Sequence, residues 1–248
     1  MRIAIAFAAL LLAAAAVVPA ARAQLVPEPV TGRQSDELVG ANGRVAVPPA
    51  TNVLTVVYDN TPSPANFGFS QPDLAGSYGD ELFTIGTGIL SENKFTIFNG
   101  STTAGQLLLT ASVRVSFFDG VTSALLGNYT TNTNFGTGLN PGFFATIDVT
   151  GIDPANINLN TNDVIVVQKF LSTTGTITRI GIASQDPPTV GSSPNTMFIS
   201  TSSIPAGFYN INSGGQPLNA NPGYLVAVNP PPVPTTSKSW TQIKKLYR

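Results

Sequence analysis

The 248-residue chain has no cysteine and no histidine, and it has a single tryptophan. Without cysteine there is no disulfide, no thiolate metal ligand and no cysteine nucleophile. Without histidine there is no Ser-His-Asp triad, and the commonest general base and ligand of catalytic zinc or copper is missing. These two absences constrain the function of the protein more strongly than any motif present in the chain.

Charge is also scarce, since charged residues make up 10% of the chain and the net charge is −1. A nearly neutral chain offers no basic patch for nucleic acid, so no nucleic-acid partner is predicted. Asn, Thr, Ser and Gly carry the polarity instead, as is typical of a turn-rich extracellular β protein. A secreted chain without disulfides favours a bacterial source.

The N-terminus has the pattern of a secretory signal peptide. Arg2 precedes an apolar run over residues 3–18, and Ala21-Arg22-Ala23 has the small-x-small pattern of a cleavage site. The run is short for a membrane span, and an uncleaved N-terminal anchor is the alternative. We predict a signal peptide over residues 1–23 and a secreted mature chain with no transmembrane span after cleavage.

Composition divides the rest of the chain into four parts. Residues 24–50 form a proline-containing leader, and residues 51–229 read as a series of short strands. Residues 230–236 are a Pro-rich, extended spacer, and residues 237–248 are a basic tail. A single β domain over 51–229 is expected for this length.

Alternation of apolar and polar residues is the main signal in this domain. The clearest stretch is TASVRVSFFDG, in which four apolar residues share one face: Ala111, Val113, Val115 and Phe117. No stretch shows a 3.6-residue period over ten or more residues, which argues against the crossover helices of a parallel sheet. We therefore predict an all-β, antiparallel, jelly-roll-like β-sandwich of about eleven or twelve strands. A parallel β-helix is the rival fold, but its repeated rung is absent.

Four stretches resemble the β-sandwich bodies of bacterial secreted proteins that often carry a PEP-CTERM sorting signal. They are VVYDNTPSPANFGF, YGDELFTIGTG, VRVSFFDG and DPPTVGSSPNTMFI. The resemblance covers about residues 53–228, and Pro187 to Ser193 is its most specific part. It implies an extracellular jelly-roll-like sandwich of unassigned biochemical function, and it implies no catalytic residue. The tail departs from that family, because it lacks the Pro-Glu-Pro motif and the apolar span.

Acidic residues are the candidates for catalysis in a chain without His or Cys. Asp80 and Glu81 are neighbours, so on a strand their side chains point to opposite faces. A glycosidase needs two carboxylates about 5 to 10 Å apart across a cleft. Asp119 and Asp186 stand beside Gly or Pro, as turn-forming residues do. We predict no catalytic residue; a glycoside hydrolase or lyase with paired carboxylates is the alternative.

Calcium is the one cofactor for which the sequence offers ligands. Ca²⁺ takes six to eight hard oxygen ligands, and the chain has two oxygen-rich stretches. The candidate ligands are Asp80, Glu81, Asn160 and Asp163. Neither stretch matches the EF-hand loop, and an Asx-rich turn is the alternative for the second one.

Aromatic residues in the first third of the domain are candidates for ligand binding. They are Tyr58, Phe67, Phe69 and Tyr78. Aromatic rings on a sandwich face can stack on sugar rings. The spacing of Phe67 and Phe69 equally fits two side chains that point into the core.

The tail has the composition of a short amphipathic helix capped by Ser239. Its recognition residues are Trp240, Ile243, Lys244, Lys245, Tyr247 and Arg248. The basic residues stand at the end where cations suit the helix dipole, but the segment is too short for a stable helix in water. It is predicted to act as a tag for sorting machinery or an anionic surface. A frayed end or a helix docked on its own sandwich is the alternative.

These observations together predict a secreted, non-catalytic β-sandwich protein of the bacterial cell surface or extracellular matrix. Adhesion or glycan binding is the expected activity, and the expected partner is an extracellular glycan or matrix component. The sequence does not identify the ligand.

Overall fold

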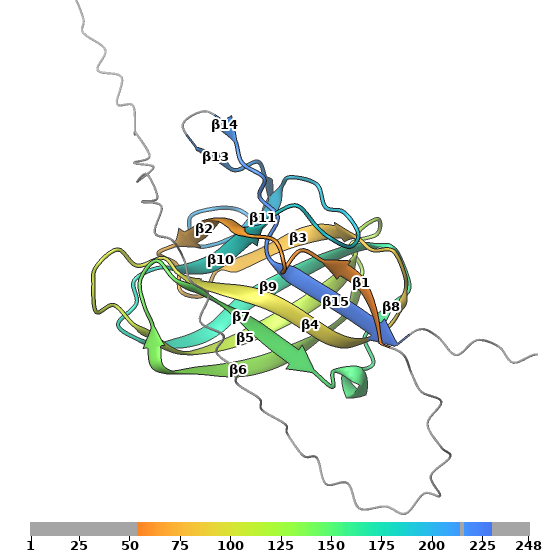
Figure 1. Ribbon diagram of the computed structural model, residues 1–248, viewed down its shortest axis with the longest axis horizontal. Coiled ribbons are helices and arrows are strands. Elements are labelled where there is room, and N and C mark those ends of the chain that lie inside the picture. Colours follow the sequence, from red (N-terminus) through yellow and green to blue (C-terminus); the bar gives the residue numbers. More distant parts are fainter. Residues whose placement is uncertain (1–53, 214–215, 230–248) are drawn as a thin grey trace, which may run out of the picture.

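The computed structural model describes residues 54–213 and 216–229. These residues form two large antiparallel sheets, a small hairpin and one short 3₁₀ helix, η1 (Asp153–Ala155) (Figure 1). The all-β prediction is confirmed for this part of the chain. The predicted signal peptide, leader, spacer and C-terminal helix lie outside the described residues. Within those residues, no helix has the length and apolar character needed to cross a membrane.

The first sheet is built around the long strand β4. Its strands are β1 (Thr55–Asp59), β2 (Ala65–Gln71), β4 (Gly88–Asn99), β7 (Phe144–Thr150), β8 (Asn158–Leu159), β10 (Ile180–Gln185) and β15 (Tyr224–Asn229). One edge of β4 pairs with β7 and β8. The other edge pairs with β15 and then, at Phe98 and Asn99, with β10, so β15 and β10 lie end to end. β1 pairs with β15, and β2 pairs with β10.

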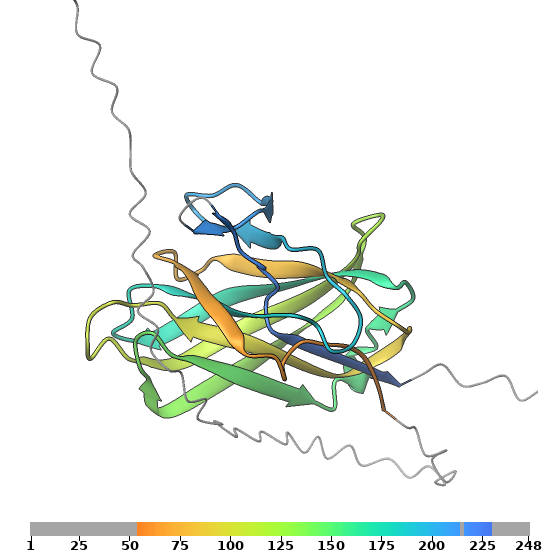
Figure 2. The ribbon, with the colours of Figure 1, turned by 45° about the horizontal axis from the view of Figure 1, so that its top comes forward.

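The second sheet has six strands in the order β12-β11-β3-β9-β5-β6. Their bounds are β3 (Ser77–Phe83), β5 (Leu108–Asp119), β6 (Leu125–Leu139), β9 (Asp163–Gly175), β11 (Met197–Ser200) and β12 (Gly207–Tyr209). The small hairpin of β13 (Asn212–Ser213) and β14 (Gln216–Pro217) stands off one side of the molecule (Figures 1 and 2).

The inward faces of the two sheets pack into one hydrophobic core, as in a β-sandwich. The predicted face of β5 is confirmed, because its four apolar residues are at most 1% exposed: Ala111, Val113, Val115 and Phe117. From the first sheet, Phe95 and Ile97 of β4 are fully buried. Burial alternates along β5, whereas β10 is buried at every position and β15 at every position except Asn229.

Hydrogen bonds also cross the core from one sheet to the other. Gln168 Nε2 of β9 donates to the carbonyl of Thr96 in β4 at 3.0 Å. The Tyr129 hydroxyl of β6 donates to Asn93 Oδ1 of β4 at 2.6 Å. Such bonds are short-ranged and directional, so they fix how one sheet lies over the other in a way that apolar contact alone does not.

Candidate functional site

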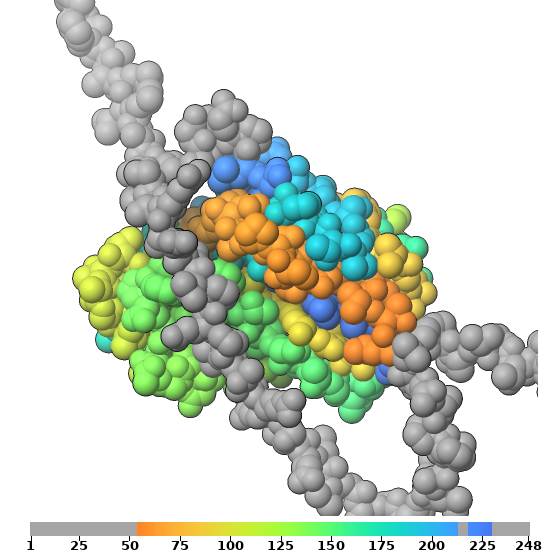
Figure 3. Space-filling view, in the orientation of Figure 1, coloured from red at the N-terminus to blue at the C-terminus, as the bar shows by residue number. Residues whose placement is uncertain are grey.

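Three of the four stretches that carry the family resemblance meet at one place. Residues 187–193, here called the strap, run between β1 of the first sheet and β3 of the second. The amides of Thr189 and Val190 donate to the Asp59 carbonyl at 2.7 and 3.1 Å. Ser192 and Phe83 exchange two backbone bonds of 2.8 and 3.0 Å. In the space-filling view this cyan region lies beside the orange N-terminal strands (Figure 3). The strap therefore joins the edges of the two sheets.

Beneath the strap, the carboxylate of Asp80 is fully buried. The Glu81 amide donates to its Oδ1 at 2.9 Å, and the Ser193 hydroxyl donates to its Oδ2 at 2.7 Å. Among the described residues the ion pairs are those of Lys94, and neither involves Asp80. Burial raises the pKa of Asp80 well above its ordinary value, and the two hydrogen bonds offset only part of this shift.

A chain of polar side chains leads from this carboxylate to the surface. Ser193 Oγ lies 3.1 Å from Asn221 Oδ1 and 3.0 Å from the Pro194 carbonyl oxygen. Asn221 Nδ2 donates to Asp186 Oδ1 at 2.5 Å. Asp186 is half-buried, whereas Asn221 is buried. We call Tyr58, Asp80, Asp186, Ser193 and Asn221, with the Pro194 carbonyl, the Asp80 cluster.

Tyr58 belongs to this cluster through its hydroxyl group. The side chain is fully buried, and its hydroxyl makes no hydrogen bond. Burial raises the pKa of Tyr58 above its usual range, and the negative charge of Asp80 raises it further. The Ser193 side chain is close enough to counter part of that shift. A buried hydroxyl without a partner is costly, so its position among these oxygens calls for an explanation.

The predicted calcium ligands do not form one site. Asp80 faces the core, while Glu81 and Asp163 lie on the outer face of the second sheet, on the neighbouring strands β3 and β9. Burial raises the pKa of Glu81, and the negative charge of nearby Asp163 raises it further. Asn160 is exposed in the turn before β9. Of the four residues, the fold brings together Glu81 and Asp163.

The predicted aromatic ligand residues contribute to the core. Tyr58 and Tyr78 are fully buried, so their rings are not available to a ligand at the surface. Phe69 and Phe170 each contact the Tyr78 ring edge-on, with centroids 6.0 Å away. Phe67 and Phe69 are partly buried and pack against the same core. These aromatic side chains therefore pack in or against the core, which was the alternative to ligand binding. The predicted tail residues lie outside the described part of the chain.

A different aromatic pair lies on the outer face of the second sheet. Phe198 of β11 and Phe208 of β12 are directly paired, with ring centroids 5.6 Å apart in an edge-to-face contact. Phe208 is 41% exposed. No binding motif in the sequence marks either residue, but the alternation in TMFIS, with Met197 and Ile199 buried, places Phe198 on the outside.

The same face of the second sheet carries two cations. Phe198 lies opposite Gly79 of β3, which has no room for a side chain because an added Cβ would lie 2.2 Å from the Val166 carbonyl oxygen. In the next row of the sheet, the exposed residues Lys169 and Arg114 are directly opposite each other. We call Gly79, Arg114, Lys169, Phe198 and Phe208 the Phe208 face. Like charges in this position repel each other, and an anionic partner would relieve the repulsion.

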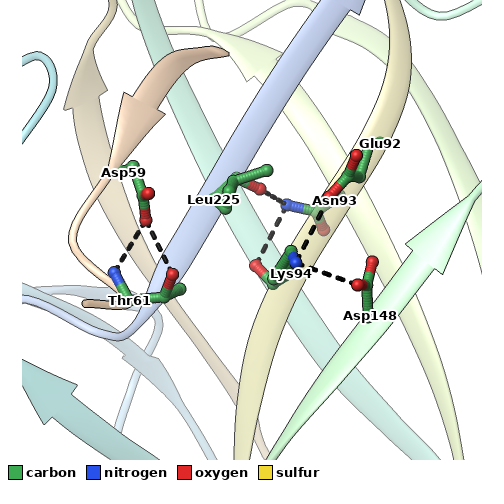
Figure 4. Close-up of polar contacts among 7 residues, drawn as sticks. All are labelled: Asp59, Thr61, Glu92, Asn93, Lys94, Asp148 and Leu225. Carbon is green, nitrogen blue, oxygen red and sulfur yellow. Dashed lines mark hydrogen bonds and ion pairs between the residues drawn. The ribbon is translucent and has the colours of Figure 1, made fainter. Parts of the chain in front are cut away.

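The outer side of the first sheet is arranged differently. Lys94 pairs with Asp148 of β7 at 2.9 Å and with Glu92 at 3.4 Å (Figure 4). These charges neutralise one another on the surface. The intervening Asn93 points to the other side of β4 and donates to the Leu225 carbonyl at 2.7 Å. The charged side chains of β4 and β7 are therefore paired with one another.

Comparisons with protein-family models, with curated proteins and with solved structures gave no significant match.

Proposed function

We propose that the protein is a secreted, non-catalytic glycan-binding module of a bacterial cell surface or extracellular matrix, and that it binds through the Phe208 face. The observation that carries the proposal is the contact of the exposed Phe208 ring with the half-buried Phe198 ring, on the sheet face that also carries Arg114 and Lys169. An aromatic ring can cover the apolar face of a sugar. With strands about 4.8 Å apart, Lys169 lies about 12 Å from Phe198, two strands away and one row further along the sheet, and Arg114 lies one strand beyond Lys169. A ligand that contacts both the rings and the cations is therefore several sugars long. An acidic polysaccharide fits both features.

The order of the strands supports a jelly roll as the finer description of the fold. Four strands of the first sheet follow the order β2-β10-β4-β7, and four of the second follow β3-β9-β5-β6. The chain passes repeatedly from one sheet to the other, as expected of eight strands in two Greek keys. Lectin domains are among the proteins with this architecture, a parallel at the level of the fold alone.

The positions of the carboxylates favour binding over catalysis. Several organise separate turns, as Asp59 does by accepting bonds of 2.8 and 2.7 Å from the amide and hydroxyl of Thr61 (Figure 4). Asp80 is buried out of reach of a sugar. Glu81 and Asp163 adjoin each other, whereas a hydrolase holds its two carboxylates about 5 to 10 Å apart around the scissile bond. The carbohydrate-active enzyme is therefore the less favoured alternative.

The test is binding of the purified protein to a glycan array, followed by titration calorimetry on the glycans retained. We expect Phe208→Ala to weaken binding about fivefold, since a stacking contact contributes about 1 kcal/mol. Phe143→Ala is the matched control, because Phe143 is 39% exposed and Phe208 is 41% exposed. An unchanged affinity in Phe208→Ala, or an equal loss in Phe143→Ala, would contradict the proposal.

The cations are tested separately from the rings. Lys169→Gln with Arg114→Gln should weaken binding to acidic glycans and leave neutral glycans unaffected. The expected loss for acidic glycans should shrink as salt is added, because exposed charges are screened over about 10 Å at 0.1 M. If the double variant binds acidic glycans as well as the unaltered protein does, the sugars lie elsewhere.

A further inference from the structure

We propose that the Asp80 cluster is a calcium site. Its ligands would be the side chains of Asp80, Ser193 and Asn221 and the carbonyl of Pro194, with the Tyr58 hydroxyl at its inner wall. The inference does not depend on glycan binding. It also differs from the sequence-based prediction, which grouped Asp80 with residues on the opposite face of the sheet.

Hydrogen-bond acceptors exceed donors in the cluster. Three oxygens surround Ser193 Oγ: Asp80 Oδ2 at 2.7 Å, the Pro194 carbonyl at 3.0 Å and Asn221 Oδ1 at 3.1 Å. The hydroxyl has one proton, so it can satisfy one of the three fully. Oxygens at these separations match neighbouring ligands around a calcium ion held at about 2.3–2.6 Å.

The Tyr58 hydroxyl is an independent observation that points to the same place. It is fully buried and has no hydrogen-bond partner, and its neighbours are Asp80 and Ser193. A hydroxyl has two lone pairs, so it can face a cation or a water bound to that cation. An ion at this point would supply the partner that the protein does not.

The buried charge of Asp80 also lacks a counterion. The basic residues of the described part are Lys94, Arg114, Lys169 and Arg179. Lys94 pairs with other acids, and Arg179 donates to the Ser70 carbonyl at 2.6 Å. Arg114 and Lys169 lie on the outside of the sheet. A buried carboxylate needs a proton or a cation, and the surplus of oxygens favours the cation.

The chemistry of the ligands selects calcium. All of the ligands are hard oxygen atoms, and none is a nitrogen or a sulfur. This ligand set does not match a zinc or copper site. Asp186 adds a second negative charge just outside, through the amide of Asn221. Asp186 and Ser193 are half-buried, so an ion can enter beside the strap. With few charged ligands, we expect a dissociation constant of about 10⁻⁴–10⁻³ M, the range of extracellular modules.

The experiment is thermal unfolding of the full chain after removal of metal with a chelator, in buffer with 10 mM CaCl₂ or with MgCl₂. Ten- to hundredfold saturation predicts an increase in Tm of about 3–10 °C with calcium. Magnesium should have a much smaller effect, because it demands a more regular and more hydrated geometry. The absence of a calcium-dependent increase would overturn the proposal.

Variants locate the ion. Asp80→Asn and Ser193→Ala should lose most of the calcium-dependent increase, and Asp163→Asn, a matched carboxylate on the outer face, should keep it. Ser193→Ala decides the question if Asp80→Asn does not fold, since Ser193 is only half-buried. An unchanged increase in Ser193→Ala, or its loss in Asp163→Asn, would show that calcium binds elsewhere and overturn the assignment.

Discussion

At the scale of single residues, Thr96 shows how a buried polar side chain replaces part of a strand ladder. Its hydroxyl accepts a bond from the Ala183 amide and donates one to the Ala183 carbonyl, each at 3.0 Å. Thr96 is 1% exposed, so its hydroxyl and the two hydrogen bonds it makes are shielded from water. The hydroxyl thereby ties β4 to β10 beside the point where β15 begins.

We expect Thr96→Val to lower the free energy of unfolding by about 1–3 kcal/mol, because the Ala183 amide would lose its side-chain partner in the interior, while the Ala183 carbonyl keeps the bond from the Gly223 amide. Urea denaturation at pH 7 measures the effect. Thr130→Val on the exposed side of β6 is the matched control and should stay within about 0.5 kcal/mol. Equal losses in both variants would mean that the cost comes from the strand and not from the buried bonds.

Asp73 offers a second test at this scale, through pH. Its carboxylate accepts bonds from the amides of Ala75 and Ser202 at 2.9 and 2.5 Å, and these bonds lower its pKa below the ordinary value of 3.8. The stability they contribute is therefore present above pH 3.8 and is lost as the pH falls through the lower pKa.

An NMR titration should give a midpoint for the Asp73 carboxyl below 3.8, and the amide signals of Ala75 and Ser202 should shift with the same midpoint. Asp73→Asn should abolish the shifts of the two amides over this range. A midpoint at or above 3.8 would show that the two bonds do not persist in solution.

At the scale of elements, alternation in the sequence predicts strands well where one face is strongly apolar. It locates β5 and its buried face. The alternation of apolar and polar residues does not show the full length of β6, which spans Leu125–Leu139. The second half of that strand is rich in Thr, Asn and Gly, because little of it faces the core, so no apolar period marks it.

Contact between strands also fixes where glycine is required. Gly181 of β10 lies so close to β2 that an added Cβ would stand 1.8 Å from the Phe69 carbonyl oxygen. The side chain of any other residue would push the two strands apart. The requirement for glycine at position 181 cannot be predicted from the local sequence, because the strand that imposes it lies more than a hundred residues away in the chain.

We expect Gly181→Ala to lower the free energy of unfolding by about 1–3 kcal/mol, the usual cost of overpacking. Gly207→Ala in β12 is the control, since its added Cβ would have no neighbour closer than 3.6 Å. Differential scanning calorimetry of both variants makes the comparison. If Gly181→Ala melts with the unaltered protein, β2 and β10 are further apart in solution.

At the scale of the whole molecule, the candidate sites escape sequence analysis because long-range pairing creates them. Tyr58, Asp80 and Ser193 come from three separate stretches, and each looks like strand or turn material by itself. The Phe208 face likewise takes residues from five strands of one sheet. The sequence indicates Asp80 as a possible ligand. It does not indicate that the strap covers Asp80, because this contact depends on the order of the strands in the two sheets.

The tail gives a prediction at the same scale. The core is closed by residues 54–213 and 216–229, so removal of residues 237–248 should change Tm by less than about 1 °C. If the tail is a sorting or anchoring tag, the truncated protein should be released from the cell fraction that retains the full chain. Replacing Lys244, Lys245 and Arg248 with Gln tests whether the charge alone is responsible. A truncated protein that fractionates like the full chain would contradict the tag.

The pairing of β1 with β15 has a mechanical consequence. Thr55 lies opposite Val228, so the two ends of the sandwich leave it at the same point, on adjacent antiparallel strands. A pulling force between the termini would load the hydrogen bonds of this pair one after another and peel the strands apart, without shearing them together. Tension would therefore open the protein at low force if it were held by both termini. If the protein adheres through the Phe208 face, the load runs from that face through the folded body to one terminus. The hydrophobic core then resists unfolding, and the β1–β15 pair is not pulled apart from both of its ends.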